Sequence, residues 1–182
     1  MAAAQRLLER GEDPSVDDVA RAAEVSRRTI YLHFPTLDQL LLDATAGLEA
    51  SGGVEEAMRS AADDGLPALE RTMTVVEAVI RQSAETLPLG RRILRLTAEP
   101  AAAPSGAPSR GFRRMGWLES AIGPLRLSDA GRDRLLAALA ALCGWETMLV
   151  LEDVRGLRGE DAVQVALWAA RLVVEGSTAA TG

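Results

Sequence analysis

The chain has 182 residues, enough for one large domain or for a small domain followed by a medium one. Hydrophobic residues make up 48% of it and aromatic residues only 3%, so strand-forming residues are scarce and an all-α fold is expected. The net charge of −6, the single cysteine (Cys143) and the single histidine (His33) exclude a generally basic surface, an intrachain disulfide and a cysteine-rich metal site.

The N-terminal residues lack the basic start and apolar run of a signal peptide, and charged residues interrupt every apolar stretch before about twenty residues. We therefore expect no membrane segment and a cytoplasmic protein. The sequence also lacks a glycine-rich phosphate loop, a nucleophile motif and a cluster of metal ligands. It predicts no catalytic residues, no metal and no cofactor, and a protein that is not an enzyme.

Helical periodicity begins at the N-terminus. A short first helix is expected to stop at Gly11, and a second helix to start after Ser15, whose side chain suits an N-cap. A third helix is expected from Ser26 to Phe34, where Pro35 ends it, and a fourth over residues 37–49.

Beyond residues 51–53 the segments are longer and their apolar faces wider. Helices are expected at Val54–Asp63, Pro67–Thr86, Gly90–Ala98, Arg110–Ile122, Asp129–Asp153 and Glu160–Glu175. Residues 101–109, rich in Ala, Pro, Ser and Gly, are predicted to form a loop that moves. The pattern predicts about nine helices in two domains: an N-terminal three-helix domain at 1–46 and a larger helical domain at 47–182.

The most informative stretch is residues 15–34, SVDDVARAAEVSRRTIYLHF. Two short helices separated by a three-residue break, the first with small alanines facing the second, form a helix-turn-helix. On a helical wheel Ile30 and Phe34 share the side that faces the core, whereas Arg28 and Leu32 point away from it. Between Val25 and Leu37 there is no acidic residue, in a chain that carries 26. The second helix is therefore predicted to enter the major groove of DNA.

The first turn of that helix carries Arg27 and Arg28, and either side chain fits guanine O6 and N7, worth about 1–3 kcal/mol of discrimination. Tyr31 and Leu32 suit contacts to bases or to a thymine methyl group, and Thr29 and Ser15 suit phosphate contacts. His33 fits a phosphate contact or a packing role. The expected DNA-binding residues are Ser15, Ser26, Arg27, Arg28, Thr29, Tyr31, Leu32, His33 and Thr36.

The run VSRRTIYLHFP at residues 25–35, with its Tyr-x-His-Phe ending, resembles the recognition helix of TetR-family repressors. Asp38, Gln39, Leu40 and Leu41 follow where that family opens its connecting fourth helix, and the close likeness covers about residues 7–43. Residues 145–170, two apolar segments around the turn EDVRGL, are similar to the family's dimerisation region. The resemblance implies an all-helical dimer whose larger domain binds a small molecule that releases DNA.

Three features depart from the family's pattern. Glu24 stands in the turn where the family has glycine, and a positive φ there would cost about 1 kcal/mol. Leu37 replaces a lysine that touches phosphate. The first helix lacks its opening turns and basic tail, which a shortened chain or a misassigned start would explain. With five arginines against eight acidic residues over positions 1–46, we expect modest affinity for nonspecific DNA.

Large side chains of the C-terminal domain are candidates to line a hydrophobic ligand cavity, with ordinary core packing as the alternative for each. They are Met73, Met115, Trp117, Cys143, Trp145 and Met148. Cys143, in the middle of an apolar helix, is expected to be a buried, unreactive thiol.

The last two predicted helices carry more apolar surface than their neighbours need, so we expect them to form a four-helix interface with a second copy. The candidates are Leu139, Leu142, Val163, Leu167 and Val174. Such a homodimer would hold its recognition helices about one DNA turn apart and would bind a pseudo-palindromic operator in double-stranded DNA.

The leading interpretation is a TetR-like DNA-binding transcriptional regulator, a repressor released from its operator by an unknown small-molecule effector. A second hypothesis is a dimeric ligand-binding or interaction protein whose DNA-binding domain has decayed, as Glu24, Leu37 and the short first helix suggest. The second hypothesis predicts small-molecule binding without DNA binding.

Overall fold

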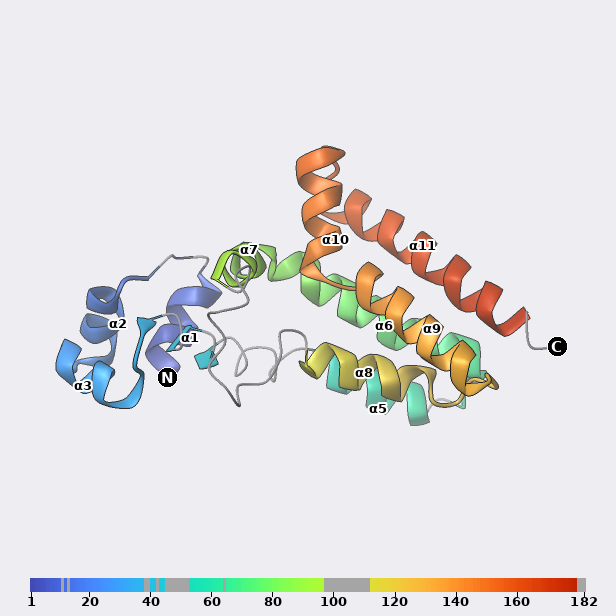
Figure 1. Cartoon of the computed structure of the whole chain (residues 1–182), viewed down its shortest axis with the longest axis horizontal. Helices are drawn as coiled ribbons and strands as arrows, with labels where there is room; N and C mark the ends of the chain where they lie inside the picture. Colours follow the sequence, from blue (N-terminus) through green and yellow to red (C-terminus); the bar gives the residue numbers. More distant parts are fainter. Residues whose placement is uncertain are drawn as a thin grey trace. The chain divides into compact units, whose positions relative to one another are not determined.

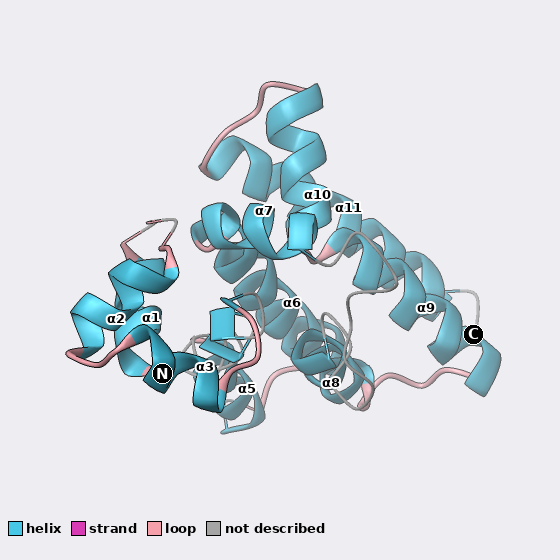
Figure 2. Ribbon diagram, turned by 60° about the vertical axis from the view of Figure 1, so that its left-hand side comes forward, coloured by secondary structure: helices cyan, strands magenta, loops and turns pink. Residues whose placement is uncertain are grey.

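The structure is a computed structural model that describes residues 1–10, 12, 14–37, 40, 41, 43, 44, 53–63, 65–96 and 112–179. Every regular element in these ranges is a helix, which confirms the all-α prediction (Figure 2). The chain forms two compact units. Of the described residues, the first unit holds 1–44 and 88–96, and the second holds 53–87 and 112–179.

The first unit contains α1 (Ala2–Glu9), α2 (Val16–Ala23) and α3 (Arg27–His33). α1 packs on α2 and α2 packs on α3. The predicted fourth helix is helical at the residues described within it, and Leu40, Leu41 and Ala44 there are buried. Gly11, Asp38, Gln39, residues 45–49 and the predicted loop at 101–109 lie outside the described residues.

Helix α7 (Leu87–Leu96) contributes residues 88–96 to the first unit. The sequence analysis had placed these residues in the C-terminal domain. Leu89 and Ile93 of this helix are buried, and the Arg92 guanidinium donates a hydrogen bond to the Pro14 carbonyl at 3.5 Å, just before α2. The grouping thus reflects contacts between segments far apart in sequence, such as this one across 78 positions, which local periodicity does not report.

The second unit is built around α6 (Ala68–Glu85), on which α5 (Val54–Asp63), α8 (Phe112–Ile122) and α11 (Glu160–Ala179) pack (Figure 1). The buried residues of α6 are Thr72, Met73, Val75, Val76, Val79, Ile80 and Ser83. The Thr72 hydroxyl is hydrogen-bonded to the Ala121 carbonyl in α8 at 2.8 Å. The bounds of α5, α6, α8 and α11 agree with the sequence prediction within a few residues.

The prediction of one continuous helix over Asp129–Asp153 is wrong. α9 (Asp129–Leu142) ends at Cys143, Gly144 is extended, and α10 (Trp145–Leu149) continues into a π-helical turn, η2 (Val150–Val154). A Cβ on Gly144 would meet the end of the Arg114 side chain, whose guanidinium is paired with Glu146 at 3.1 Å. The indole N–H of Trp145 donates to the Thr86 hydroxyl at 2.9 Å. Contacts to α6 and α8 thus accompany the break, at a glycine against which the Arg114 and Glu146 side chains lie closely.

Among the described residues, no single helix has the length and apolar character to cross a membrane. One bent pair, Asp129–Leu142 with Trp145–Val154 at 44°, passes the same test of length and composition when the two are taken together.

Glu24, the C-cap of α2, adopts the left-handed conformation, with φ 56° and ψ 38°. It is the one non-glycine residue with positive φ in the described part of the chain. Because a side chain in this region costs about 1 kcal/mol and glycine does not, Glu24→Gly should raise the free energy of unfolding by about that amount. Urea unfolding measures the change. Glu24→Ala, which removes the same charge but keeps a Cβ, is the control, and equal stability of the two variants would contradict the assignment of strain.

Candidate nucleic-acid interface

The N-terminus of α2 is closed by a capping box. Ser15 Oγ accepts from the Asp18 amide at 3.3 Å, and the Ser15 backbone N–H donates to Asp18 Oδ2 at 2.9 Å. The Ser15 hydroxyl also contacts the same carboxylate at 2.5 Å. These hydrogen bonds lower the pKa of Asp18. The hydroxyl predicted to contact phosphate is therefore already engaged with a carboxylate of its own helix.

Helix α3 begins at an N-cap, Ser26, whose Oγ accepts from the Thr29 amide at 3.1 Å and lies 2.9 Å from the Thr29 hydroxyl. Ile30 is buried on the inner side, at 6% exposure. On the outer side Leu32 is 72% exposed and Tyr31 50%. The predicted orientation of this helix within its unit is therefore confirmed at these residues, since Ile30 faces inward and Leu32 faces solvent.

The two arginines of the first turn differ in their contacts. Arg27 forms a two-point ion pair with Asp17 of α2, through Nε to Oδ1 and Nη2 to Oδ2. Arg28 is exposed and has no ion pair with any residue in the described ranges. Arg21 of α2 pairs with Asp18 at 3.1 Å. Of these three arginines, only Arg28 presents an uncompensated positive charge.

The remaining predicted DNA-binding residues, His33 and Thr36, are exposed at the end of α3 and just beyond it. All nine predicted residues thus lie in the first unit, and all of them except Ser15 lie on or beside α3. Sequence reasoning did not find the role of Asp17 as the partner of Arg27. The two residues are ten positions apart, and only the packing of α2 on α3 brings them together.

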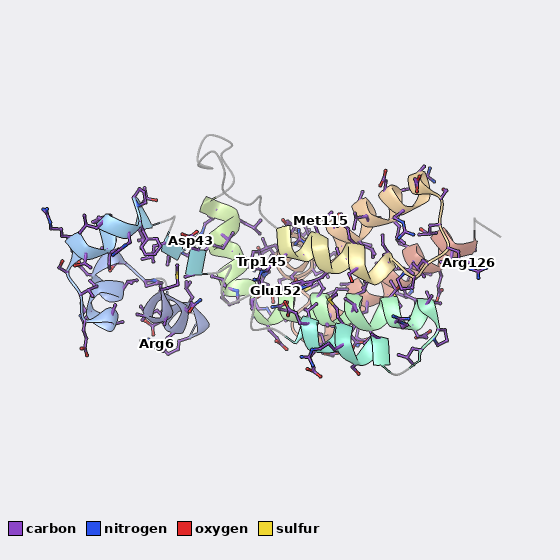
Figure 3. The ribbon with its side chains drawn as sticks, turned by 90° about the horizontal axis from the view of Figure 1, so that it is seen from below. Arg6, Asp43, Met115, Arg126, Trp145 and Glu152 are labelled. Atoms are coloured by element: carbon purple, nitrogen blue, oxygen red, sulfur yellow. The ribbon has the colours of Figure 1, made fainter. Side chains whose placement is uncertain are left out.

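The predicted ligand-pocket residues lie in the second unit, where Figure 3 labels two of them, Met115 and Trp145. Met115 is half-buried, and the other five, Met73, Trp117, Cys143, Trp145 and Met148, are buried. The indole N–H of Trp117 donates to Glu55 Oε1 at 3.2 Å. Burial raises the pKa of the Cys143 thiol to about 12, as expected for an unreactive cysteine.

The predicted dimer residues divide into two groups. Leu139, Val163 and Val174 are fully or almost fully buried within the single chain, so their side chains are not available to a partner. Leu142 and Leu167 are half-buried. The exposed apolar side chains nearby are different ones: Val165, Trp168 and Leu172 on α11, and Val150 and Val154 on α10–η2. The spacing of 165, 168 and 172, one helical face, was visible in the sequence.

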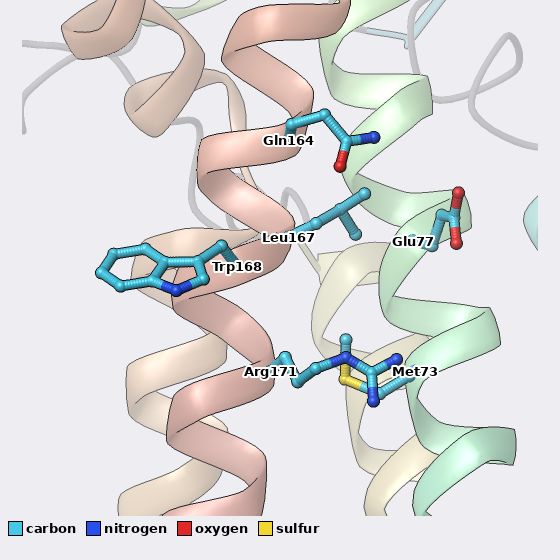
Figure 4. Close-up of a pocket in the computed structure, with 6 residues that line it drawn as sticks. All are labelled: Met73, Glu77, Gln164, Leu167, Trp168 and Arg171. Atoms are coloured by element: carbon cyan, nitrogen blue, oxygen red, sulfur yellow. The ribbon is translucent and has the colours of Figure 1, made fainter.

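A shallow groove of about 290 Å³ runs between α6 and α11 (Figure 4). It is lined by Met73, Glu77, Gln164, Leu167, Trp168 and Arg171. The Trp168 ring extends away from α6 in this view, on the outer side of α11 (Figure 4). Of the predicted pocket residues, the groove includes only Met73.

Comparison with known proteins points to the first unit. The family of bacterial regulatory proteins named tetR matches residues 1–44. A relative, the HTH-type transcriptional regulator EthR of Mycolicibacterium smegmatis, is 37% identical over 79 residues, which is 41% of this chain and 36% of that protein. The match thus spans about a third of the relative's own length.

The matched segment coincides with α1, α2, α3 and the described start of the following helix. It includes the exposed recognition face and the capped, acid-flanked start of α2. The N-terminal helix-turn-helix segment of this chain is thus similar to that of the tetR family of bacterial regulatory proteins.

Proposed function

We propose that this protein is a DNA-binding transcriptional regulator that acts as a homodimer on a pseudo-palindromic operator. The observation that carries the proposal is the orientation of α3: Ile30 is buried beneath it, while Arg28, Tyr31 and Leu32 face solvent from its outer side. A helix presented in this way fits the major groove, where arginine reads guanine and apolar side chains contact thymine methyl groups. The relative that is named a transcriptional regulator supports the same function.

Arg28→Ala should weaken sequence-specific binding while leaving the fold intact, because the side chain is exposed and has no ion pair among the described residues. Loss of one bidentate guanine contact corresponds to about 1–3 kcal/mol per half-site. Gel-shift titration at low salt against the gene's own upstream region measures the change. Arg126→Ala, which removes an exposed arginine from the second unit, is the control. Equal retardation of the DNA by wild type and by Arg28→Ala would contradict the proposal. Absence of any retardation by wild type would contradict it too. If such a wild-type protein still bound a small molecule, the result would favour a decayed DNA-binding domain.

The exposed apolar face of α11 supports dimerisation. Val165, Trp168 and Leu172 lie on one side of the helix, and Trp168 is 65% exposed. Operators with two half-sites need two recognition helices at a fixed separation, which a twofold interface supplies. The occupant we propose for this face is a second copy, whose own α11 and α10–η2 would cover it. Leu142 and Leu167 would border the contact, as the sequence predicted.

Trp168→Glu should convert the dimer into a monomer at micromolar concentration, because it places a charge in the centre of an apolar contact. Sedimentation velocity measures the mass. Leu66→Glu, which adds a charge at an exposed apolar residue outside this face, should leave the mass unchanged. A monomeric wild type, or a Trp168→Glu variant that stays dimeric, would contradict the proposed interface.

We further propose that the protein is a repressor released by a small molecule bound in the second unit beside Glu55 and Trp117. Glu55 Oε2 is buried and has no hydrogen-bond partner among the described residues, although Oε1 accepts from the Trp117 indole. A buried acceptor without a partner costs about 1–3 kcal/mol, which a ligand's donor group would remove. An apolar molecule that carries a hydrogen-bond donor, such as an amine, fits this combination of carboxylate and indole.

Phenylalkylamines should therefore raise the melting temperature and quench tryptophan fluorescence, whereas the matching phenylalkanes should do less. Glu55→Gln should remove the preference for the amine, because it removes the carboxylate charge. The same amines should release wild-type protein from DNA in the gel-shift assay, by binding the DNA-free conformation more tightly. An amine preference that persists in Glu55→Gln would contradict the site, and release of DNA without a thermal shift would contradict the coupling.

A further inference from the structure

The contact between Asp17 and Arg27 uses one particular edge of the guanidinium. Asp17 Oδ1 and Oδ2 receive Nε and Nη2, the side-on edge nearest the arginine stem. A guanidinium has five N–H donors in a rigid planar fork. Two are engaged here, so the end-on pair formed by Nη1 and the second Nη2 proton stays available. That pair has the spacing that matches guanine O6 and N7.

The contact also fixes where the fork points. Asp17 lies in the first turn of α2 and Arg27 is the first residue of α3, so the ion pair joins the N-terminal ends of both helices of the helix-turn-helix. An arginine held by a planar carboxylate retains fewer orientations than one attached only by its flexible stem. The Arg27 side chain is nevertheless 63% exposed, so its outer edge is accessible to a partner.

The negative charge of Asp17 is expected to weaken nonspecific binding of the domain to DNA. A negative charge near the recognition helix repels phosphates and cancels the charge of Arg27, which lowers the number of phosphates that the domain neutralises. As an exposed ion pair, it contributes little to stability. The helix dipole also favours an acid in the first turn of α2, but Asp18 is an acid in the same turn, so the dipole does not account for the pairing of Asp17 with Arg27.

We infer that Asp17 is a positioning residue that holds Arg27 for end-on reading of guanine and prevents it from contacting phosphate. The inference rests on the proposed DNA-binding function and deepens it by assigning two roles. Arg28 supplies the uncompensated positive charge of the recognition helix together with its own base contact, and the neutralised Arg27 supplies a second guanine contact that adds only sequence discrimination. Asp17 thereby lowers the affinity for nonspecific DNA and raises the sequence specificity of binding.

The experiment uses the full-length protein and two probes. The first is a duplex selected by the wild-type protein from a pool of random sequences, and the second is the same duplex with its sequence scrambled. Wild type, Asp17→Asn, Arg27→Ala and the double variant are titrated against both over a range of salt concentrations. Glu24→Gln is the matched control, since it removes one exposed acidic charge from the same domain without touching Arg27.

For Asp17→Asn we expect binding to the selected duplex to weaken by at least about 5-fold per half-site, as for loss of a guanine contact. Binding to the scrambled duplex should strengthen, with a salt dependence steeper by about 0.9 per protomer, as Arg27 gains a phosphate. Glu24→Gln should change both affinities alike. In the Arg27→Ala background, Asp17→Asn should have no further effect on the ratio of the two affinities. Replacing the contacted guanine with 7-deazaguanine should weaken wild type but not Arg27→Ala.

An Asp17→Asn variant that keeps or increases the ratio of selected to scrambled affinity would overturn the inference, as would an equal effect of Asp17→Asn with and without Arg27. Either result leaves DNA binding by the protein in place. A wild-type protein that selects no sequence from the pool would instead overturn the proposed function, and the inference with it.

Discussion

The packing of α3 on α2 is the constraint on which the rest of the DNA-binding argument depends. Val19 and Ala20 of α2 and Ile30 of α3 are buried in this unit, and the small alanine allows the two backbones to approach. Because a helix turns about 100° per residue, burying Ile30 fixes the direction of every other side chain on α3. Arg28 and Leu32 are exposed as a direct consequence. The strained conformation of Glu24 is tolerated for the same reason, since the turn must bring α3 back across α2.

Most of the positive charge near α3 is neutralised by neighbouring acidic residues. Arg21 and Arg27 are each paired with an aspartate in the first turn of α2, and the backbone donors there are already capped by Asp18 and Ser15. The domain thus has little of the basic surface that drives nonspecific association with DNA. For the proposed regulator, this charge distribution would make binding depend on direct base contacts and on two copies acting together, and would keep its affinity for unrelated DNA low.

In the second unit, α6 and α11 each bury one side in the core, and α11 has a second apolar side that is exposed. α6 is buried along most of one side, and its hydroxyl and indole partners tie it to α8 and α10. α11 uses Val163, Ala166, Ala170 and Val174 for this core, which leaves Val165, Trp168 and Leu172 on the opposite side. A helix that is apolar on both sides needs a second partner, and this separates the surface proposed for dimerisation from the core.

The sequence by itself determined the helical class, the helix-turn-helix and the face that α3 presents, because each follows from local periodicity, N-capping residues and turn residues within about twenty positions. The tertiary structure decided which residues were left for a partner, the break of α9 at Gly144, the grouping of α7 with the first unit and the pairing of Asp17 with Arg27. Each of these depends on contacts between segments distant in sequence or on competition between faces for the same core. Leu139, Val163 and Val174 illustrate the limit, since apolar spacing shows that a side chain needs burial but not which surface buries it.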